Sequence, residues 1–418
     1  MINFQKIVKS KVKILIYCLN YHPEIVGAGK YSTEMSEWLS NRGFQVKVIT
    51  STPYYPEWKL KSRNVYKKEC INGVEVLRSP LWVPNNPNGP KRIIHLLSFA
   101  FLSLPLLLRN FFWKPSLIIT IAPTLFCIPG SIFLGLICGS KTRNLLHIQD
   151  YEIEAAFKLG LLKGQKLQNI ILFLERIFLR RFNKITSISE AMVNHLKSKK
   201  IDDKKSIFFP NWIDTELIKS KRKFLNPYRR ELSILDDEIV LHYSGALGTK
   251  QGIDIILESI ELLKDTKKIV WVIGGEGPLK NLLIEKTKKY SNVRITKLQP
   301  IERISDWLTL ADIHLLPQKI AAADLVLPSK LLGMMASGRP IVAISPKESE
   351  LGRLVSVAGI QLDYDNAMDF SNAVLSLINN KEMTIQKGKN ARKLVEELYD
   401  KKKVLSNFES ELENLIIL

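Results

Sequence analysis

The sequence predicts an α/β protein built from two Rossmann-like domains whose parallel sheets face a central cleft. Residues 12–50 and residues 239–275 support this prediction, because each stretch runs through a strand, a glycine-containing loop, a helix and a second strand. Short apolar runs alternate with helical patterns through most of the remaining chain, which is typical of parallel sheets. The 418 residues are enough for two such domains, each with its own core.

We expect a first domain over residues 1–215, a second over residues 216–400, and a C-terminal helix over residues 401–418 that packs back toward the first domain. Residues 219–227 are basic and lack periodicity, so they are the expected linker.

Each expected strand is a short apolar run bounded by turn residues. In the first domain the strands are expected at residues 12–18, 45–50, 74–78, 117–121, 143–149, 184–187 and 207–210. Helices are expected at residues 31–41, 125–138 and 166–182, and Ser189 is a favourable N-cap for a further helix. In the second domain we expect strands at residues 239–244, 268–274 and 311–317, and helices at residues 254–264 and after residue 327.

Two apolar stretches raise the question of membrane insertion. Residues 117–138 are long enough to span a bilayer, but Pro123, Pro129 and Gly130 interrupt them, so a buried strand and a helix are expected. Residues 93–108 would reach only ~24 Å as a helix, short of the ~30 Å hydrocarbon core. Two interpretations stay open for them: a core helix, or a helix that dips into one leaflet and is held by its aromatic and basic flank.

The net charge of +20 is concentrated in the first half of the chain. Residues 1–200 carry 29 Lys and Arg against 11 Asp and Glu, a net charge of +18, whereas residues 201–418 carry 32 against 30. A basic surface attracts polyanions, but no zinc-ligand spacing, RNA-binding aromatic run or basic-region heptad is visible, so no nucleic acid is expected. An anionic membrane surface is the expected partner, with a solvated lysine-rich surface as the alternative.

The four cysteines form no C-x-x-C pair, which favours thiols in a reducing compartment.

The strongest local signal is a set of loops that follow strands in the second half. Glycines let a backbone approach an anion closely, and lysines beside helix N-termini add positive charge. The first loop holds Gly245, Gly248, Lys250 and Gly252, and the later loops hold Gly277, Ser329 and Lys330. Because ligands bind at the carboxyl ends of strands in open parallel sheets, these loops together predict a diphosphate site.

At these positions the second half resembles the nucleotide-binding domain of family-4 glycosyltransferases of the GT-B fold. The residues that carry this likeness are Ser244, Gly245, Leu247, Lys250, Gly252, Gly274, Gly277, Pro278, Asp312, Ala336, Gly338 and Pro340. Residues 186–190 and 210–214 also fit that family. The motifs at residues 20–24, 29–31, 53–56, 123–127, 147–152 and 209–212 are more closely similar to the colanic-acid and O-antigen branch.

This resemblance implies a retaining glycosyltransferase that takes a sugar from a nucleotide sugar, expected to be UDP-linked. The implied acceptor is a saccharide on a polyprenyl diphosphate, used to make O-antigen, capsule or exopolysaccharide. The implied location is cytoplasmic, peripheral on the inner face of the plasma membrane.

The resemblance also assigns roles to the two domains. The second domain would bind the donor through Gly245, Leu247, Gly248, Lys250, Gly277, Ser329 and Lys330. The first would bind the acceptor, with Gly27, Gly29, Lys30 and Tyr31 toward the substrate. His147 and Asp150 would orient the sugar or the acceptor hydroxyl and act in catalysis with Lys250; a buried, hydrogen-bonded core histidine is the alternative for His147.

Departure of the leaving group adds about one negative charge to the diphosphate. Lys250, Lys330 and helix N-termini are expected to stabilise that charge, so neither a metal nor another cofactor is expected. Asp363 and Asp365 have the spacing of the metal-binding motif of other transferases, but they come late in the second domain and are expected in a turn after a strand.

Some positions depart from the family pattern. This chain has Ala246 where the family has the phosphate-loop arginine, and Gln251 where the family has the lysine. Leu325 and Gly333 take the places of the paired glutamates, and Gln149 takes the place of the histidine of the His-Asp pair.

A nicotinamide dehydrogenase would need an acidic residue after the second strand, and residues 50–55 offer none. A sugar-nucleotide epimerase of the same fold and a non-enzymatic membrane-associated binding protein stay as alternatives.

Overall fold

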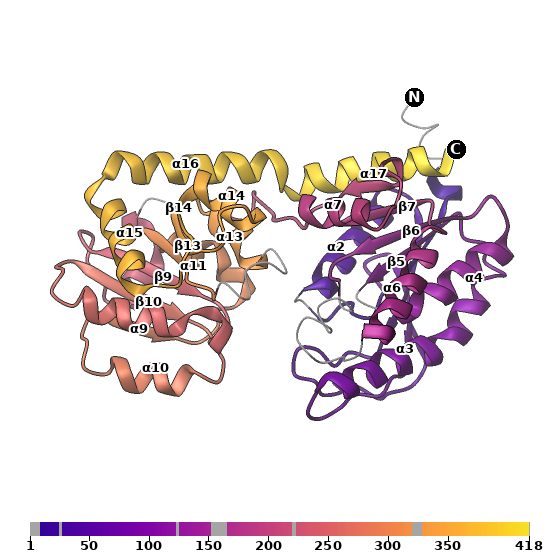
Figure 1. Ribbon diagram of the computed structural model, residues 1–418, viewed down its shortest axis with the longest axis horizontal. Helices are drawn as coiled ribbons and strands as arrows, with labels where there is room; N and C mark the ends of the chain where they lie inside the picture. The colour runs from indigo at the N-terminus through magenta and orange to yellow at the C-terminus, as the bar shows by residue number, and fades with distance from the viewer. Residues whose placement is uncertain are drawn as a thin grey trace. The chain divides into compact units, whose positions relative to one another are not determined.

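The computed structural model describes residues 9–24, 27–122, 125–151, 165–219, 223–319 and 328–417. The chain divides into two compact units (Figure 1). The first runs to Pro210 and takes up the chain again from Leu405, and the second runs from Asn211 to Val404. Each unit is a mainly parallel sheet covered by helices, which confirms the predicted fold class.

The sheet of the first unit has eight strands in the order β3-β4-β2-β1-β5-β6-β7-β8. All neighbours pair in parallel except β3, which is antiparallel to β4. The strands are β1 (Lys13–Tyr17), β2 (Gln45–Ser51), β3 (Lys67–Ile71), β4 (Val74–Ser79), β5 (Leu117–Ala122), β6 (Arg143–Ile148), β7 (Lys184–Ser187) and β8 (Ser206–Phe208). Every residue of β5 is buried, because helices cover both faces of such a sheet. The sequence does not signal β3, an exposed edge strand that reads Lys-Lys-Glu-Cys-Ile.

Four helices follow one another across one face of this sheet: α3 (Gly89–Arg109), α4 (Ile128–Cys138), α6 (Gln165–Leu179) and α7 (Glu190–Ser198). Gly130 of α4 lies against Leu104 and Leu107 of α3. Ile132 of α4 and Leu179 of α6 share one core cluster, and α7 begins at the predicted cap, where the Ser189 hydroxyl accepts the Met192 N–H. The helix α2 (Ala28–Asn41) connects β1 to β2 in the opposite direction across the sheet, so right-handed crossovers place it on the other face.

The second unit has a six-stranded parallel sheet in the order β11-β10-β9-β12-β13-β14. Its strands are β9 (Ile239–Ser244), β10 (Ile269–Gly274), β11 (Val293–Thr296), β12 (Ile313–Leu316), β13 (Ile341–Ile344) and β14 (Gly359–Leu362). Its helices are α8 (Pro227–Glu231), α9 (Ile253–Leu262), α10 (Lys280–Thr287), α11 (Ile304–Thr309), α13 (Ser329–Ala336), α14 (Glu350–Ala358) and α15 (Ala367–Asn379). The strand order reverses between β9 and β12, and ligands bind at such a point in open α/β sheets.

Two helices, α16 (Lys381–Leu398) and α17 (Lys401–Ile417), close the chain. Arg392 of α16 ties this helix to the second unit by donating to the carbonyls of Thr215, Ile218 and Ala336. The later part of α17 belongs to the first unit. There Glu409 accepts hydrogen bonds from the Lys9 Nζ at 2.5 Å and the Trp38 Nε1 at 2.9 Å.

The expected linker at residues 219–227 is wrong, since this segment lies inside the second unit. The Asn226 side chain donates to the Asp306 carbonyl, and its oxygen caps α8 by accepting the Tyr228 N–H. Tyr228 is buried against Trp307. The segment's described residues 223–227 lack periodicity because they form a short 3-10 turn and the start of α8.

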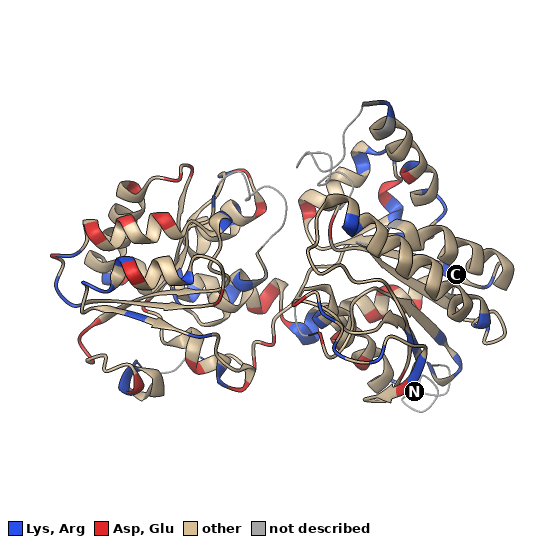
Figure 2. Ribbon diagram, turned by 90° about the horizontal axis from the view of Figure 1, so that it is seen from below, with Lys and Arg blue, Asp and Glu red and all other residues tan. Residues whose placement is uncertain are grey.

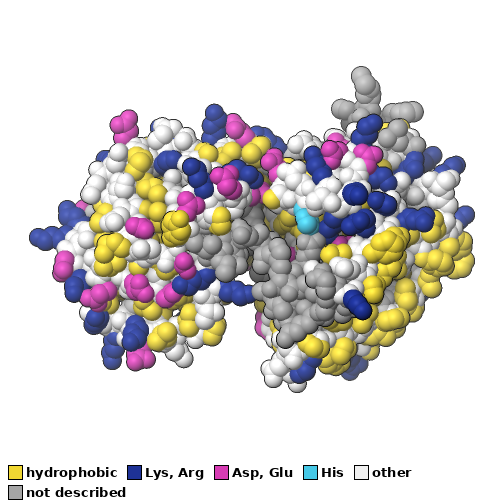
Figure 3. Space-filling view, viewed as in Figure 1, with side chains coloured by type: hydrophobic (Ala, Val, Ile, Leu, Met, Phe, Trp, Pro, Cys, Tyr) yellow, Lys and Arg dark blue, Asp and Glu magenta, His cyan; other side chains and the backbone are white. Residues whose placement is uncertain are grey.

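The apolar residues 117–138 form β5 and α4 instead of one spanning helix, as expected. By length and composition, α3 is the one helix in the described part of the chain that could cross a membrane. One of its faces is built into the first unit, where Ser103 shares a 2.5 Å hydrogen bond with the Tyr17 hydroxyl. Helices of the first unit, which carries both chain ends, are uncharged over long stretches (Figure 2), and hydrophobic side chains gather on its surface (Figure 3).

Three histidines lie inside the two sheets and are held neutral. Burial lowers the pKa of His147 on β6 and of His242 on β9 to about 3, and also lowers the pKa of His314 on β12. His242 packs edge-on against Trp307 at 4.5 Å, and neither of its ring nitrogens has a hydrogen-bond partner among the described residues.

These histidines predict acid sensitivity. Each binds a proton in the unfolded chain below a pH of about 6.5 but resists protonation in the fold, so stability falls as the pH drops from about 6.5 toward 3. The slope is about 1.4 kcal/mol per pH unit for each histidine. Urea unfolding at pH 7.5 and pH 5 should show the loss, and His242→Phe should reduce it. An equal loss in that variant would contradict the assignment to His242.

Candidate functional site

The predicted donor loops of the second unit meet at the carboxyl ends of β9, β10 and β12. Gly245 follows β9 directly, and its N–H donates to the Gly274 carbonyl at the end of β10. Leu247 is buried and donates to the Glu276 carbonyl, while its own carbonyl accepts the Leu279 N–H. The loop after β9 is therefore held against the loop after β10 by backbone bonds.

Three glycines let these loops approach closely. A Cβ on Gly252 would lie 1.4 Å from the Pro317 carbonyl oxygen after β12, and Gly252 has a φ of +65°. A Cβ on Gly277 would lie 2.4 Å from the Leu247 oxygen, and one on Gly275 would lie 1.9 Å from the Gly245 oxygen. No side chain fits at these contacts, so glycine is required for packing as well as for access to a ligand. Gly275 and the role of Pro317 are not signalled by the sequence.

Lys330 brings a positive charge to this point. It is the second residue of α13, and its Nζ lies 4.4 Å from the Tyr243 ring centroid. The same nitrogen would lie 3.2 Å from a Cβ placed on Gly245. Burial of the amine lowers the pKa of Lys330 to about 8. Among the described residues this amine has no hydrogen-bond or ion-pair partner, and it lies beside Gly245.

The remaining predicted donor residues lie around the same loop. Gly248 precedes a short 3-10 turn that holds Lys250, whose side chain is exposed and whose carbonyl accepts the Lys319 N–H. Ser329 is the first residue of α13, with Pro328 at the N-cap position. The Ser329 side chain and Leu325, which takes the place of one family glutamate, lie outside what the structure describes.

In the first unit, the predicted acceptor residues surround the start of α2. Gly27, with a φ of +56°, is the N-cap of that helix, and Gly29 is buried in its first turn. Lys30 forms a 4.0 Å ion pair with Glu34. Tyr31 is buried, so its side chain serves the core while its backbone belongs to the helix N-terminus.

The sequence did not single out Glu24 as a site residue, but the structure gives it a positioning role. Its buried carboxylate accepts the backbone N–H groups of Tyr54 and Tyr55 at 2.8 and 2.7 Å, and the Asn20 amide at 2.8 Å. A Cβ on Gly29 would lie 2.6 Å from the Glu24 carbonyl oxygen. Glu24 therefore joins the loops after β1 and β2 to the start of α2. In the sequence, Glu24 appears only as part of the family-like motif at residues 20–24, which does not show this anchoring role.

His147 and Asp150 lie at the carboxyl end of β6. Gln149 donates to the His147 Nε2 at 2.8 Å, and the His147 Nδ1 bonds the Thr186 hydroxyl at 2.9 Å, which assigns the proton to Nδ1. Both nitrogens are thus engaged within the unit, as in the core-histidine alternative. Asp150 is half-buried just after the strand, and burial raises its carboxyl pKa. Asp150 is the better placed of the two to meet a ligand.

Three acidic residues have roles within the second unit. Asp363 accepts the Lys347 N–H at 2.9 Å in the turn after β14, and Asp365 lies 3.5 Å from the Lys319 Nζ. Asp312 accepts the Val240 N–H and pairs with Arg229. Among the residues that the structure describes, no three His, Cys, Asp or Glu side chains gather as a metal site would require.

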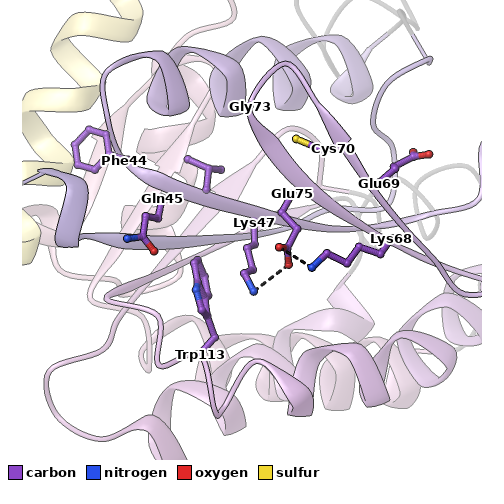
Figure 4. A pocket seen from close by; sticks show the side chains of 10 residues that line it. Phe44, Gln45, Lys47, Lys68, Glu69, Cys70, Gly73, Glu75 and Trp113 are labelled. Atoms are coloured by element: carbon purple, nitrogen blue, oxygen red, sulfur yellow. Dashed lines mark ion pairs between the residues drawn. The ribbon is translucent and has the colours of Figure 1, made fainter.

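A separate hollow of about 790 Å³ opens at the amino ends of β2 and β4, away from the carboxyl ends that carry the predicted residues (Figure 4). Lys47 and Lys68 both pair with Glu75 there, at 2.9 and 3.0 Å. The Lys47 Nζ also lies 4.5 Å from the Trp113 ring centroid. These internal pairs offset the positive charge, so the hollow has no evident anion site.

Comparison with known proteins agrees with this geometry. Residues 26–212 match the model of a "Glycosyl transferase 4-like domain", and residues 238–380 match "Glycosyl transferases group 1". The chain is 35% identical over 406 residues to WcaI of Escherichia coli (strain K12), named as a colanic acid biosynthesis glycosyl transferase, with 95% of this chain and 98% of WcaI covered.

Two solved structures show the same fold at 14% sequence identity. The sucrose-phosphate synthase of Thermosynechococcus elongatus has a TM-score of 0.72, with 97% of this chain and 100% of that chain covered. Alr3699/HepE of Anabaena, solved in complex with UDP, has a TM-score of 0.69, with 96% and 100% covered. The two parallel-sheet units, the glycine loops and the WcaI likeness identify this chain as a member of the family-4-like, group 1 glycosyltransferases of the GT-B fold.

Proposed function

We propose that this glycosyltransferase moves a sugar from a UDP-sugar to a saccharide on a polyprenyl diphosphate, with retention of anomeric configuration, in the synthesis of a cell-surface polysaccharide. The proposal places it peripherally on the cytoplasmic face of the plasma membrane. The observation that carries the donor assignment is the Lys330 amine, which lies beside Gly245 where the strand order reverses. The UDP complex of Alr3699/HepE and the name of WcaI support the donor and the pathway class.

In the proposed reaction, the bond between the sugar C1 and the diphosphate oxygen breaks, and an acceptor hydroxyl oxygen bonds to C1 on the same face. The hydroxyl O–H bond breaks as well, and its proton passes to the departing diphosphate oxygen. The diphosphate gains about one negative charge as it leaves. Lys330, Lys250 and the N–H groups at the start of α13 stabilise that charge, since cations and helix N-termini interact most strongly with the form that carries it. Asp150 orients the acceptor hydroxyl, and Gly27, Gly29 and Lys30 contact the acceptor.

A panel of UDP-, GDP- and dTDP-sugars tests the donor by thermal shift, followed by transfer to a short-chain polyprenyl diphosphate saccharide. Stabilisation by UDP-sugars and an α-linked product from an α-linked donor are expected. Free sugar released without an acceptor would instead favour the epimerase alternative. Stabilisation by none of the nucleotides would contradict the donor assignment.

The pKa of Lys330 predicts how UDP binding depends on pH. The amine is charged below a pH of about 8 and loses its charge above it, so affinity for UDP should fall as the pH rises from 7 to 9.5. Calorimetric titration with UDP across this range measures the effect, and Lys330→Arg, which stays charged, should flatten the profile. A wild-type affinity that is constant across the range would contradict the role of Lys330.

The same lysines predict that transfer does not require a divalent metal. With EDTA present, the transfer rate should stay within about twofold of the untreated enzyme, because fixed cations already oppose the charge on the diphosphate. Rate measurements with EDTA, and after addition of Mg²⁺ or Mn²⁺, check this. Strong inhibition that either metal reverses would contradict it and return attention to Asp363 and Asp365.

A further inference from the structure

The helices α3, α4 and α6 of the first unit present a row of exposed apolar side chains, which we call the three-helix apolar face. Its most prominent members are Phe101 and Leu108 of α3, Phe133 and Leu136 of α4, and Ile170 and Phe173 of α6. Phe101 is 67% exposed, Leu136 66% and Phe173 60%. Hydrophobic side chains gather along the α3 and α4 side of the first unit, whereas on the second unit they alternate with charged ones (Figure 3).

The exposed side chains of this face are not part of the core of the first unit. Each helix already buries its inner side: Phe99 and Leu107 of α3, Ile132 and Leu134 of α4, and Leu179 of α6 are all buried. A surface helix normally carries polar residues on its outer side. The 11 residues of α4 include no charged one, although Phe133 and Leu136 point outward. Apolar surface of this extent on a folded protein marks an interaction site.

The charges in the part of the chain that holds α3 and α4 are of one sign. No Asp or Glu occurs at residues 76–149, which include all of α3 and α4. Over the same stretch, exposed cations flank the helices: Lys91 and Arg92 at the start of α3, Arg109 and Lys114 at its end, and Lys141 after α4. The one carboxylate of α6, Glu175, is buried in a 2.6 Å pair with Lys199.

Aromatic residues lie just after α3, next to the cations at its end. Phe112, just after α3, is 82% exposed. The Nζ atoms of Lys13 and Lys47 lie 5.9 and 4.5 Å from the centroid of the Trp113 ring. Apolar side chains bordered by aromatic rings and then by cations match the layers of a lipid surface, from acyl chains through the interface to the phosphates.

We propose that the three-helix apolar face docks on a lipid monolayer that contains anionic headgroups. Phe101, Phe133, Leu136 and Phe173 enter the acyl region, and the cations at both ends of α3 contact phosphates. The helix α3 lies along the surface and does not cross the bilayer, because its inner side is bonded into the unit through Ser103 and through the His95 Nδ1, which lies 2.6 Å from the Trp82 carbonyl oxygen. This inference rests on the proposed lipid-linked acceptor, and it extends the membrane-facing surface from α3 to α4 and α6.

Co-sedimentation with vesicles of phosphatidylglycerol and phosphatidylethanolamine, and with vesicles of phosphatidylcholine alone, tests the proposal at low and high salt. The test variant is Phe101→Gln/Leu136→Gln/Phe173→Gln. The matched control is Leu235→Gln/Leu298→Gln/Ile301→Gln in the second unit, where the three side chains are 65%, 61% and 56% exposed. A charge variant, Lys91→Glu/Arg92→Glu, measures the electrostatic contribution to vesicle binding.

The full-length protein should bind the anionic vesicles, and the test variant should lower its partition coefficient by at least about tenfold at both salt concentrations. The control should bind like the unmodified protein. The charge variant should weaken binding at low salt only, because high salt already screens that attraction. Circular dichroism and thermal unfolding check the folding of each variant, and Leu136→Gln alone serves if the triple variant does not fold.

Two outcomes would overturn the proposal. One is vesicle binding by the test variant that equals that of the unmodified protein. The other is a dimer, seen by sedimentation velocity, that the test variant dissociates without any change in vesicle binding, since a second copy would then cover the face. Transfer to a water-soluble short-chain acceptor separates this proposal from the proposed function. The test variant should keep that transfer activity. If the unmodified protein itself lacks transfer activity, that result contradicts the proposed function and leaves the docking proposal unaffected.

Discussion

Replacing Lys330 by alanine should lower the transfer rate at least tenfold while the protein stays folded. The Lys330 amine is the charge that the structure brings closest to Gly245, and the loss of one charge-assisted contact to a diphosphate costs about 1.5–3 kcal/mol, or roughly ten- to a hundredfold. Lys250→Ala should have an effect in the same direction. Steady-state rates with a UDP-sugar and UDP affinities measure both variants.

Two controls sharpen this test. Lys330→Met keeps the apolar stem that lies beside Gly245 and removes only the charge, so it should be as slow as the alanine variant. Lys286→Ala, on the exposed side of α10, should behave like the unmodified enzyme. Full activity of both Lys330→Ala and Lys250→Ala, with UDP affinity unchanged, would sink the donor-site assignment.

Gly252→Ala should destabilise the second unit by more than about 3 kcal/mol and abolish UDP binding. The added Cβ would lie 1.4 Å from the Pro317 carbonyl oxygen, so the loop after β9 and the loop after β12 could not keep their contact. Those two loops flank the point where the strand order reverses, so their separation would also displace Lys250. Urea unfolding and calorimetric titration with UDP measure the two effects.

The matched control is Gly139→Ala. Gly139 also has a positive φ, of +94°, but a Cβ there meets nothing within 4 Å. This control measures the backbone cost of alanine at a positive φ without a steric clash, about 1–3 kcal/mol. If both variants lost equal stability, the clash with Pro317 would have no role.

Periodicity and turn residues were sufficient to predict most strands and helices. The buried strands of a parallel sheet are continuous apolar runs, which the sequence shows directly at β1, β5, β9 and β10. The edge strand β3 was not predicted, because its five residues are mostly polar and exposed. The wrong linker has a similar cause: residues 219–227 look irregular, but Asn226 donates a hydrogen bond to the Asp306 carbonyl, 80 residues further along the chain.

The donor loops were predictable as a set because glycine and lysine at strand ends have few uses other than tight turns and anions. Which of those residues has a free charge was not predictable. Lys319 has its amine in ion pairs with Asp254 and Asp365, whereas Lys330 has no such partner in the described part of the chain. His147 likewise looked like a candidate from its place after a strand, and it proved to be bonded on both ring nitrogens.

The sequence by itself determined the fold class, the two-unit plan and the family, because these depend on local patterns that repeat along the chain. The tertiary structure alone decided three things: the close contact of Gly252 with Pro317, the anchoring of two loops by Glu24, and the outward orientation of Phe133, Leu136 and Phe173. Each of these depends on distances between residues far apart in sequence, or on which side of an apolar helix faces the core. Periodicity cannot show that side in α4, where nearly every residue is apolar and the contacts with α3 and the sheet fix the rotation of the helix.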